Sequence, residues 1–254
     1  MGRRRENDEL AFLSQQVEAF KKLREPSIQL ILKARGAISK GKDRIGIFPA
    51  SFNPPTLAHL ALIKEARSRD HLHEIVLVLD IHPKDKKRVG AALGDRLYLL
   101  KKLFRRDPQI SIGLSNRGLF VEKLRPLTSL YPPGVTYVFV VGLDTISRVM
   151  DRRYYENRDR SLEVLFSHCR FFVASRGDRS KEAFENLFKR EGNERFRHHI
   201  SFAVLARKFS FISSSLVRHR IRKGQSIEGF VPLEVQRFIQ MKRLYLTRAP
   251  SRST

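Results

Sequence analysis

The chain has 254 residues, 41% of them hydrophobic, which suffices for one substantial core and one α/β domain with an extension. Its 50 lysines and arginines against 26 acidic residues give a formal net charge of +24, which favours polyanions: nucleotides, nucleic acid or an anionic membrane surface. The single cysteine, Cys169, excludes an intrachain disulfide and a Cys/His zinc motif. No stretch reaches the roughly 18 apolar residues of a membrane span, so we expect a cytoplasmic protein that is neither secreted nor embedded in a membrane.

Residues 1–43 are predicted to form a helical extension of the main domain. Between Glu6 and Leu23 the apolar residues recur at helical spacing, and Pro26 ends that pattern. A second short helix is expected over residues 28–37, before Gly41. The extension is either a docking or dimerising arm, which leaves a homo-oligomer open, or a structural addition packed on the domain. We favour the packed addition.

Residues 44–65 predict a buried strand, a proline-containing loop and an amphipathic helix. Thr56 lies at the expected cap of the helix and His59 in its first turn. Free N–H groups and the positive end of the helix dipole favour an anion at such a turn, and an imidazole can donate one more hydrogen bond to it. The segment therefore indicates phosphate chemistry. The alternative is a histidine that only caps or packs.

The middle of the chain reads as strands alternating with helices. Continuous apolar runs at residues 73–79, 135–141 and 169–175 are typical of strands buried on both faces of a parallel sheet. Lys86 and Lys87 follow the first of these runs, at the end of a strand where α/β sheets bind ligands, although a solvated basic loop would look the same. Gly142 and Asp144 follow the second run, where the carboxylate can accept hydroxyl hydrogen bonds or cap the next helix.

Residues 211–238 contain a second anion-binding pattern. Ser213, Ser214 and Ser215 can cap a helix and present hydroxyl and N–H groups to a polyphosphate. Arg218, one turn later, can reach the same anion with a two-pronged guanidinium. A plain basic helix with a serine cap is the alternative. Residues 244–254 are predicted to be a fraying tail.

Both patterns resemble the nucleotidylyltransferases with an HxGH signature, especially the nicotinamide and nicotinate mononucleotide adenylyltransferases. Their opening, roughly G-x-F-[DN]-P-x-[HT]-x-x-H-L, is matched from Gly46 to Leu60, with Thr56 in place of the first histidine, as in the eukaryotic type. Their I-S-S-T-x-I-R signature is matched from Ile212 to Arg218, with Ser215 in place of threonine. The resemblance spans about residues 44–240 and is weaker in the middle.

The resemblance implies a Rossmann-like, mostly parallel sheet of five or six strands over residues 44–243, with helices on both faces. It implies that His59 and Arg218 stabilise charge during catalysis. It implies nucleotide or phosphate contacts for Ser51, Phe52, Thr56, Lys86, Lys87, Gly142, Asp144, Ser213, Ser214 and Ser215. Arg96 and Phe120 are expected at the substrate, and no protein metal site is expected.

The expected reaction is adenylyl transfer from ATP to nicotinamide or nicotinate mononucleotide, assisted by Mg²⁺. The chain has no tryptophan, whereas many pyridine-nucleotide members place one against the pyridine ring; Phe120 or Tyr154 would have to substitute. Cytidylyl or adenylyl transfer to another phosphorylated acceptor is therefore an alternative. A basic nucleic-acid-binding protein that has lost catalysis on this fold is a second, which the complete set of His59, Asp144 and Arg218 disfavours.

Overall fold

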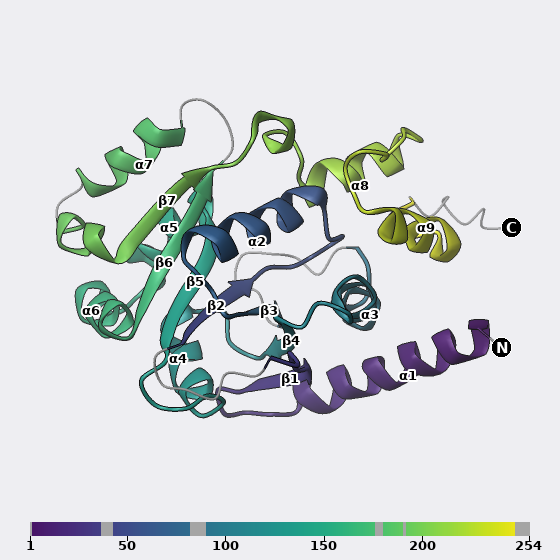
Figure 1. Ribbon diagram of the computed structural model, residues 1–254, viewed down its shortest axis with the longest axis horizontal. Helices are drawn as coiled ribbons and strands as arrows, with labels where there is room; N and C mark the ends of the chain where they lie inside the picture. The colour runs from purple at the N-terminus through teal and green to yellow at the C-terminus, as the bar shows by residue number, and fades with distance from the viewer. Residues whose placement is uncertain (1, 37–42, 82–89, 176–179, 190–191, 247–254) are drawn as a thin grey trace, which may run out of the picture.

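A seven-stranded sheet forms the centre of the computed structural model, which describes residues 2–36, 43–81, 90–175, 180–189 and 192–246 (Figure 1). Its strands are β1 (Ile28–Leu32), β2 (Arg44–Pro49), β3 (Glu74–Asp80), β4 (Ile110–Ser115), β5 (Thr136–Gly142), β6 (Cys169–Ser175) and β7 (Ile200–Val204). Their order across the sheet is β1-β4-β3-β2-β5-β6-β7, and every pairing is parallel except that of β1 with β4. This confirms the expected Rossmann-like, mostly parallel sheet.

Helices cover both faces of the sheet. They are α1 (Gly2–Lys21), α2 (Leu57–Arg69), α3 (Leu93–Phe104), α4 (Phe120–Thr128), α5 (Leu143–Val149), α6 (Arg158–His168), α7 (Ser180–Phe188), α8 (Ser214–Arg222) and α9 (Leu233–Lys242). Short 3₁₀ turns cover Arg152–Tyr154, Glu194–His199 and Arg207–Phe209. One hydrophobic cluster joins the sheet to α1, α2, α3, α8 and α9, and a second joins the opposite face to α4, α5, α6 and α7.

The alternation of side chains along the strands explains the two clusters. In β3, Ile75 and Leu77 belong to the first cluster, while Val76 and Val78 belong to the second. Successive residues of a strand point to opposite faces, so a strand covered by helices on both sides must be apolar throughout. The continuous apolar runs therefore predicted these strands correctly.

The expected helix over residues 28–37 is wrong, because its first part is strand β1. Ile28, Gln29 and Leu30 pair antiparallel with Ser115, Leu114 and Gly113 of β4. Leucine and glutamine are good helix formers, but the open edge of β4 offers a hydrogen-bonding partner that local propensity does not reveal. β7 was not foreseen either. With β1 and β7 the sheet exceeds the five or six strands expected.

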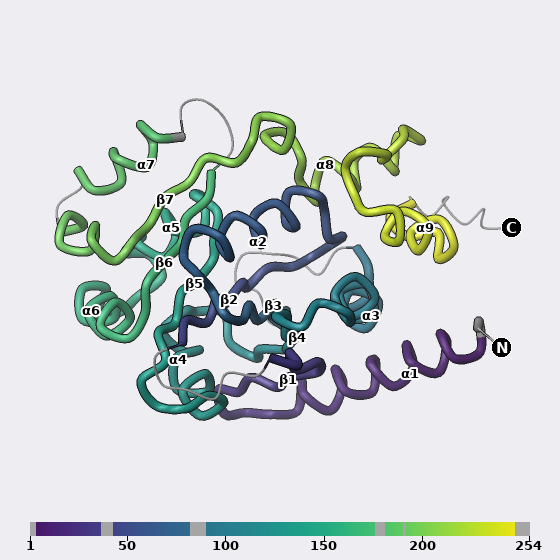
Figure 2. The backbone as a smooth tube through the Cα atoms, viewed as in Figure 1, coloured from purple at the N-terminus to yellow at the C-terminus, as the bar shows by residue number. Residues whose placement is uncertain are grey.

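The N-terminal helix lies beside the main domain and is not separate from it. α1 packs against α3 and lies next to it at the lower right of Figures 1 and 2, and Leu13 and Phe20 of α1 are buried in the first hydrophobic cluster. This supports the packed addition over a free arm. Within the described residues, no helix combines the length and the apolar character needed to cross a membrane.

Candidate active site

A cleft of about 1100 Å³ opens at the carboxyl ends of the central strands. The chain runs outward from β2 to β4, then returns to place β5 beside β2 and runs outward the other way. The junction of β2 and β5 is thus the point where the strand order reverses, and ligands of open α/β sheets bind outside the strands at such a point. Residues at the ends of β2 and β5 or just after them, including Ser51, Gly142 and Asp144, line the cleft.

The loop after β2 brings Asn53, Thr56 and His59 to the cleft wall. The Asn53–Pro54 peptide bond is cis, and Thr56 is the N-cap of α2. The backbone N–H of Thr56 donates to Nδ1 of His59 at 3.0 Å, and the Thr56 Oγ1 lies 2.7 Å from the same nitrogen. His59 therefore completes the cap of its own helix, as the alternative interpretation of this residue required, and it also lines the cleft.

The capping bond determines which nitrogen of His59 can donate. A backbone N–H can only donate, so Nδ1 accepts and the proton of the neutral ring lies on Nε2. The ring packs against Phe48 and Phe52, with centroids 5.9 and 5.1 Å away. Phe52 is 1% exposed and does not line the cleft. Its ring packs against the ring of His59 instead.

Helix α8 is hydrogen-bonded to the loop that follows β2. Ser213 caps α8 by accepting from the N–H of Leu216 at 3.1 Å. The Ser214 hydroxyl donates to the carbonyl oxygen of Pro54 at 2.8 Å, and Arg218 donates through Nη1 to the carbonyl oxygen of Asn53 at 2.6 Å. The two signature segments, more than 150 residues apart in the sequence, therefore form one cleft wall.

Arg218 and Arg96 place two guanidinium groups in this wall. Arg218 also donates through Nη2 to the Ser215 hydroxyl at 3.2 Å. Arg96 is held by the carbonyl oxygen of Ala91 at 2.8 Å and that of Ser51 at 3.4 Å. Burial lowers the pKa of both arginines from the ordinary value, and an arginine still keeps its charge at neutral pH. Both groups are thus oriented cations in the cleft.

A second cavity of about 130 Å³ adjoins the cleft and shares Ser51, Asp80 and Arg96 with it. Its other side is formed by aromatic residues, Phe120, Tyr154 and Tyr155. Both substitutes considered for the missing tryptophan, Phe120 and Tyr154, therefore lie at the same cavity. A flat apolar surface next to a cleft with oriented cations suits a molecule that carries both an aromatic ring and a phosphate.

Asp80 stands at the boundary between the two cavities and is paired with a buried cation. The Lys123 side chain is 1% exposed; its Nζ lies 3.1 Å from Asp80 Oδ1 and donates to the carbonyl oxygen of Arg117. A buried ammonium is costly unless it is paired and hydrogen-bonded, so the contact with Asp80 compensates the burial of Lys123 and fixes the Asp80 side chain in place. The sequence did not reveal this pair, because Lys123 reads as an ordinary charge on an amphipathic helix.

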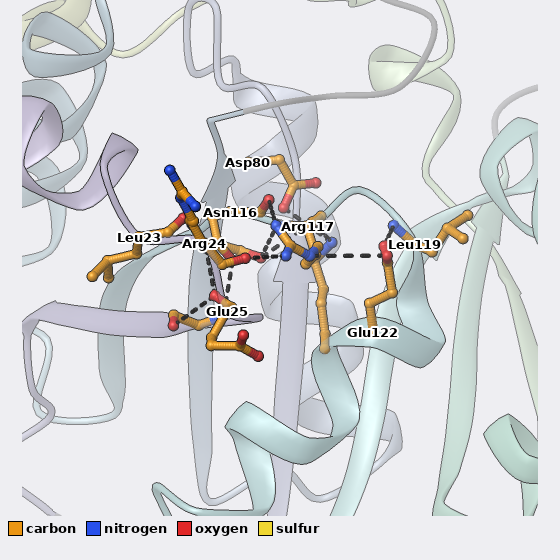
Figure 3. Close-up of polar contacts among 11 residues, drawn as sticks. Leu23, Arg24, Glu25, Asp80, Asn116, Arg117, Leu119 and Glu122 are labelled. Carbon is orange, nitrogen blue, oxygen red and sulfur yellow. Dashed lines mark hydrogen bonds and ion pairs between the residues drawn. The ribbon is translucent and has the colours of Figure 1, made fainter.

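Residues 116 and 117, just after β4, are hydrogen-bonded to the connection between α1 and β1 (Figure 3). Asn116 donates to the carbonyl oxygens of Leu23 at 3.1 Å and Glu25 at 2.7 Å, and Arg117 donates to that of Arg24. The next residues, Gly118 to Phe120, line the second cavity. The N-terminal segment therefore fixes one wall of that cavity, which is a role that its sequence did not reveal.

A family model described as cytidylyltransferase-like matches residues 47–220, a span that contains the second signature segment and all of the first except Gly46. The chain belongs to the cytidylyltransferase-like family.

Curated relatives of this family member carry adenylyltransferase names. A probable nicotinate-nucleotide adenylyltransferase of Carboxydothermus hydrogenoformans is 28% identical over 207 residues, covering 80% of this chain and 98% of the relative. A putative nicotinamide mononucleotide adenylyltransferase of Schizosaccharomyces pombe is 30% identical over 136 residues, covering 52% and 53% of the two chains. The similarity inferred from the two signatures is therefore confirmed.

Solved structures share the fold of this cytidylyltransferase-like chain. The nicotinic acid mononucleotide adenylyltransferase of Plasmodium falciparum, complexed with NaAD, has a TM-score of 0.60 and 20% identity, covering 80% of this chain and 97% of its own. The complex of the same enzyme with APC has a TM-score of 0.57.

Most of the expected site residues meet at the cleft. The cleft is lined by Ser51, Thr56, His59, Arg96, Gly142, Asp144, Ser213, Ser214, Ser215 and Arg218, and Phe120 lines the second cavity. Lys86 and Lys87 lie outside the described residues. Sequence reasoning missed Arg148 and Arg222, which line the cleft, and also Glu18 and Lys21 of α1. Among the described residues, no group of three or more His, Cys, Asp or Glu could hold a metal ion.

Proposed function

We propose that this protein transfers the adenylyl group of ATP to the phosphate of nicotinamide or nicotinate mononucleotide, forming a dinucleotide and pyrophosphate. The observation that carries the proposal is the junction of the two signature segments, Ser214 with Pro54 and Arg218 with Asn53, at the ligand-binding edge of the sheet. The names of the curated relatives support the same reaction. The adjoining aromatic cavity supplies room for the ring of the acceptor.

The reaction needs no enzyme nucleophile. The acceptor phosphate attacks the α-phosphorus of ATP, so the protein contributes by positioning two anions and stabilising the charge that redistributes between them. We assign His59 Nε2–H, Arg218 and the N–H groups at the start of α8 as the donors to the triphosphate. Because Nδ1 accepts from Thr56, the donor nitrogen of His59 is set by the fold and needs no protonation event.

We place the acceptor across Arg96 and the second cavity, with its ring against Phe120 or Tyr154. Gly142 and Asp144, at the end of β5, are assigned to the ribose hydroxyl groups. Mg²⁺ would arrive with ATP, since triphosphate oxygens are the hard ligands that it prefers, and it would neutralise charge on the leaving pyrophosphate. A cytoplasmic location and a homo-oligomer stay predictions.

A substrate panel tests the proposal. Purified protein with Mg²⁺ and ATP is supplied with either pyridine mononucleotide, and dinucleotide and pyrophosphate are measured together. We expect both products in equal amounts, and none from a His59→Ala, Arg218→Ala double variant prepared identically. Parallel reactions replace ATP with CTP and the acceptor with choline phosphate, a polyol phosphate or pantetheine phosphate. If product forms only in those parallel reactions, the protein uses another nucleotide or another acceptor. If no product forms in any reaction, nucleotidyl transfer is refuted.

A further inference from the structure

The chain turns back towards the cleft after the last helix, α9. Arg243 and Tyr245 have positive φ angles of 49° and 67°. Such angles are uncommon for residues with bulky side chains, and they persist only where surrounding contacts hold them. Here the N–H of Leu244 donates to the carbonyl oxygen of Ile239 at 3.0 Å, and Leu244 and Tyr245 pack against the first hydrophobic cluster. The expectation of a fraying tail from residue 244 is therefore wrong for these two residues.

The Tyr245 side chain contacts Asn53, a residue that lines the cleft. Its hydroxyl donates to Oδ1 of Asn53 at 2.9 Å, and the backbone N–H of Ala91 donates to the same oxygen at 3.2 Å. Two donors on one amide atom fix the orientation of the Asn53 amide, since only the oxygen can accept from both. The carbonyl oxygen of Asn53 meanwhile accepts from Arg218. Asn53 is thus a junction of the C-terminal segment, the turn at residues 90–92 and helix α8.

The junction is tightly enclosed. Asn53 is 5% exposed. Gly90 has a φ of +104°, and a Cβ added to it would lie 2.6 Å from both Nδ2 and Oδ1 of Asn53. Position 90 must therefore be glycine for Asn53 to approach. Arg96, Arg218 and Asp95 are the charged groups that interact with Tyr245. Burial raises the pKa of Tyr245, so its hydroxyl keeps its proton and donates over the whole neutral range.

We propose that Tyr245 is a positioning residue of the nucleotide site. Through Asn53 it holds the Arg218 guanidinium and the 90–92 turn where both substrates need them. The inference rests on the proposed adenylyl transfer, and it extends the site to a part of the chain beyond the family match at residues 47–220. Loss of one neutral hydrogen bond of this kind corresponds to about a five- to tenfold effect.

The test compares Tyr245→Phe with Tyr137→Phe. Each substitution removes one hydroxyl group, and Tyr137 donates to the carbonyl oxygen of Leu127 at 3.2 Å, within the core on the opposite face of the sheet. We expect Tyr245→Phe to lower kcat/KM for ATP about five- to tenfold and to weaken ATP binding measured by calorimetry. Tyr137→Phe should leave both unchanged per folded molecule.

Hydrogen exchange gives a readout that does not need activity. The amide of Ala91 should exchange faster in Tyr245→Phe than in the wild type, and at the wild-type rate in Tyr137→Phe, because only the first loosens Asn53. Deleting residues 244–254 should also speed Ala91 exchange and weaken ATP binding, since it removes the Tyr245 hydroxyl. Unchanged Ala91 exchange and unchanged ATP binding in Tyr245→Phe would overturn the inference. A wild type with normal Ala91 protection but no transfer to any acceptor would instead refute the proposed function alone.

Discussion

His59 combines a structural bond with a place in the cleft, so one substitution affects two properties that must be measured separately. Its Nδ1 accepts from the N-cap of α2, and its ring packs against Phe48 and Phe52. Sequence reasoning offered capping and phosphate binding as alternatives. The structure shows the capping bond at Nδ1, and the proposed phosphate contact is compatible with it because the two nitrogens of one imidazole can serve different partners.

His59→Ala should lower kcat about a hundred- to a thousandfold, which is the usual cost of removing one preorganised donor to developing charge. It should also lower the melting temperature moderately, since the capping bond is worth about 1 kcal/mol. Both quantities are measured on the same preparation. Thr56→Val is the comparison, because it removes the hydroxyl beside Nδ1 but keeps the imidazole. A destabilised His59→Ala protein with near-normal turnover would assign His59 a capping role only.

Arg218→Lys should weaken ATP binding about tenfold or more while the protein stays folded. Arg218 contacts the Asn53 carbonyl oxygen with one nitrogen and the Ser215 hydroxyl with another, and a lysine cannot reproduce that planar fork. Calorimetry with ATP measures the effect. Arg220→Lys is the matched control on the same helix, where the guanidinium donates to the Ser226 carbonyl oxygen instead. Equal ATP affinity in both variants would contradict our placement of the triphosphate.

At the scale of elements, α1 and α3 approach each other closely at Gly94 of α3, which faces Ser14 of α1. A Cβ on Gly94 would lie 2.5 Å from Oγ and 3.4 Å from Cα of Ser14. Ion pairs support the same contact, with Lys101 to Glu9 at 2.5 Å and Lys102 to Glu6 at 3.3 Å. Ser14 and Gly94 also line the cleft, so the packing of α1 shapes the site.

Gly94→Val should therefore destabilise the protein by about 1–3 kcal/mol, the usual cost of overpacking, although valine is a better helix former than glycine. Thermal unfolding measures the change. Ser14→Gly should relieve part of it in the double variant, giving a favourable coupling energy in a double-mutant cycle. Additive effects would mean that the two helices do not press on each other at this point.

The elements that the sequence predicted correctly are those whose signal is local. β3, β5 and β6 are continuous apolar runs between polar segments, and α8 begins at a serine cap. β1 could not be predicted in this way, because its strand conformation depends on pairing with β4. Tyr245 and Lys123 escaped for a related reason. Each looks like a surface residue in its own segment, and only the tertiary structure brings it into contact with a residue that lines the cleft, Asn53 for Tyr245 and Asp80 for Lys123.

At the scale of the whole molecule, the net charge is +24, whereas the described residues of the cleft lining hold five cationic and three acidic side chains. Among the described residues, its charged groups are Lys21, Arg96, Arg148, Arg218 and Arg222 against Glu18, Asp80 and Asp144. The surrounding field should therefore steer an anionic substrate to the cleft, while oriented donors inside it hold the substrate. These two contributions respond differently to salt.

Raising KCl from about 0.05 to about 0.5 M should lower kcat/KM for ATP several-fold and change kcat much less, because exposed charges are screened beyond a few ångströms at high salt while buried donors are not. Mg²⁺ is kept in excess of ATP throughout. A DNA duplex added at low salt should inhibit through its affinity for the basic surface, and the same KCl should abolish that inhibition. The nucleic-acid-binding alternative predicts a salt-dependent affinity for duplex or RNA, with no pyrophosphate released from ATP at any KCl concentration. Measuring both activities across one salt series therefore separates a nucleotidyltransferase with a basic surface from a nucleic-acid-binding protein on the same fold.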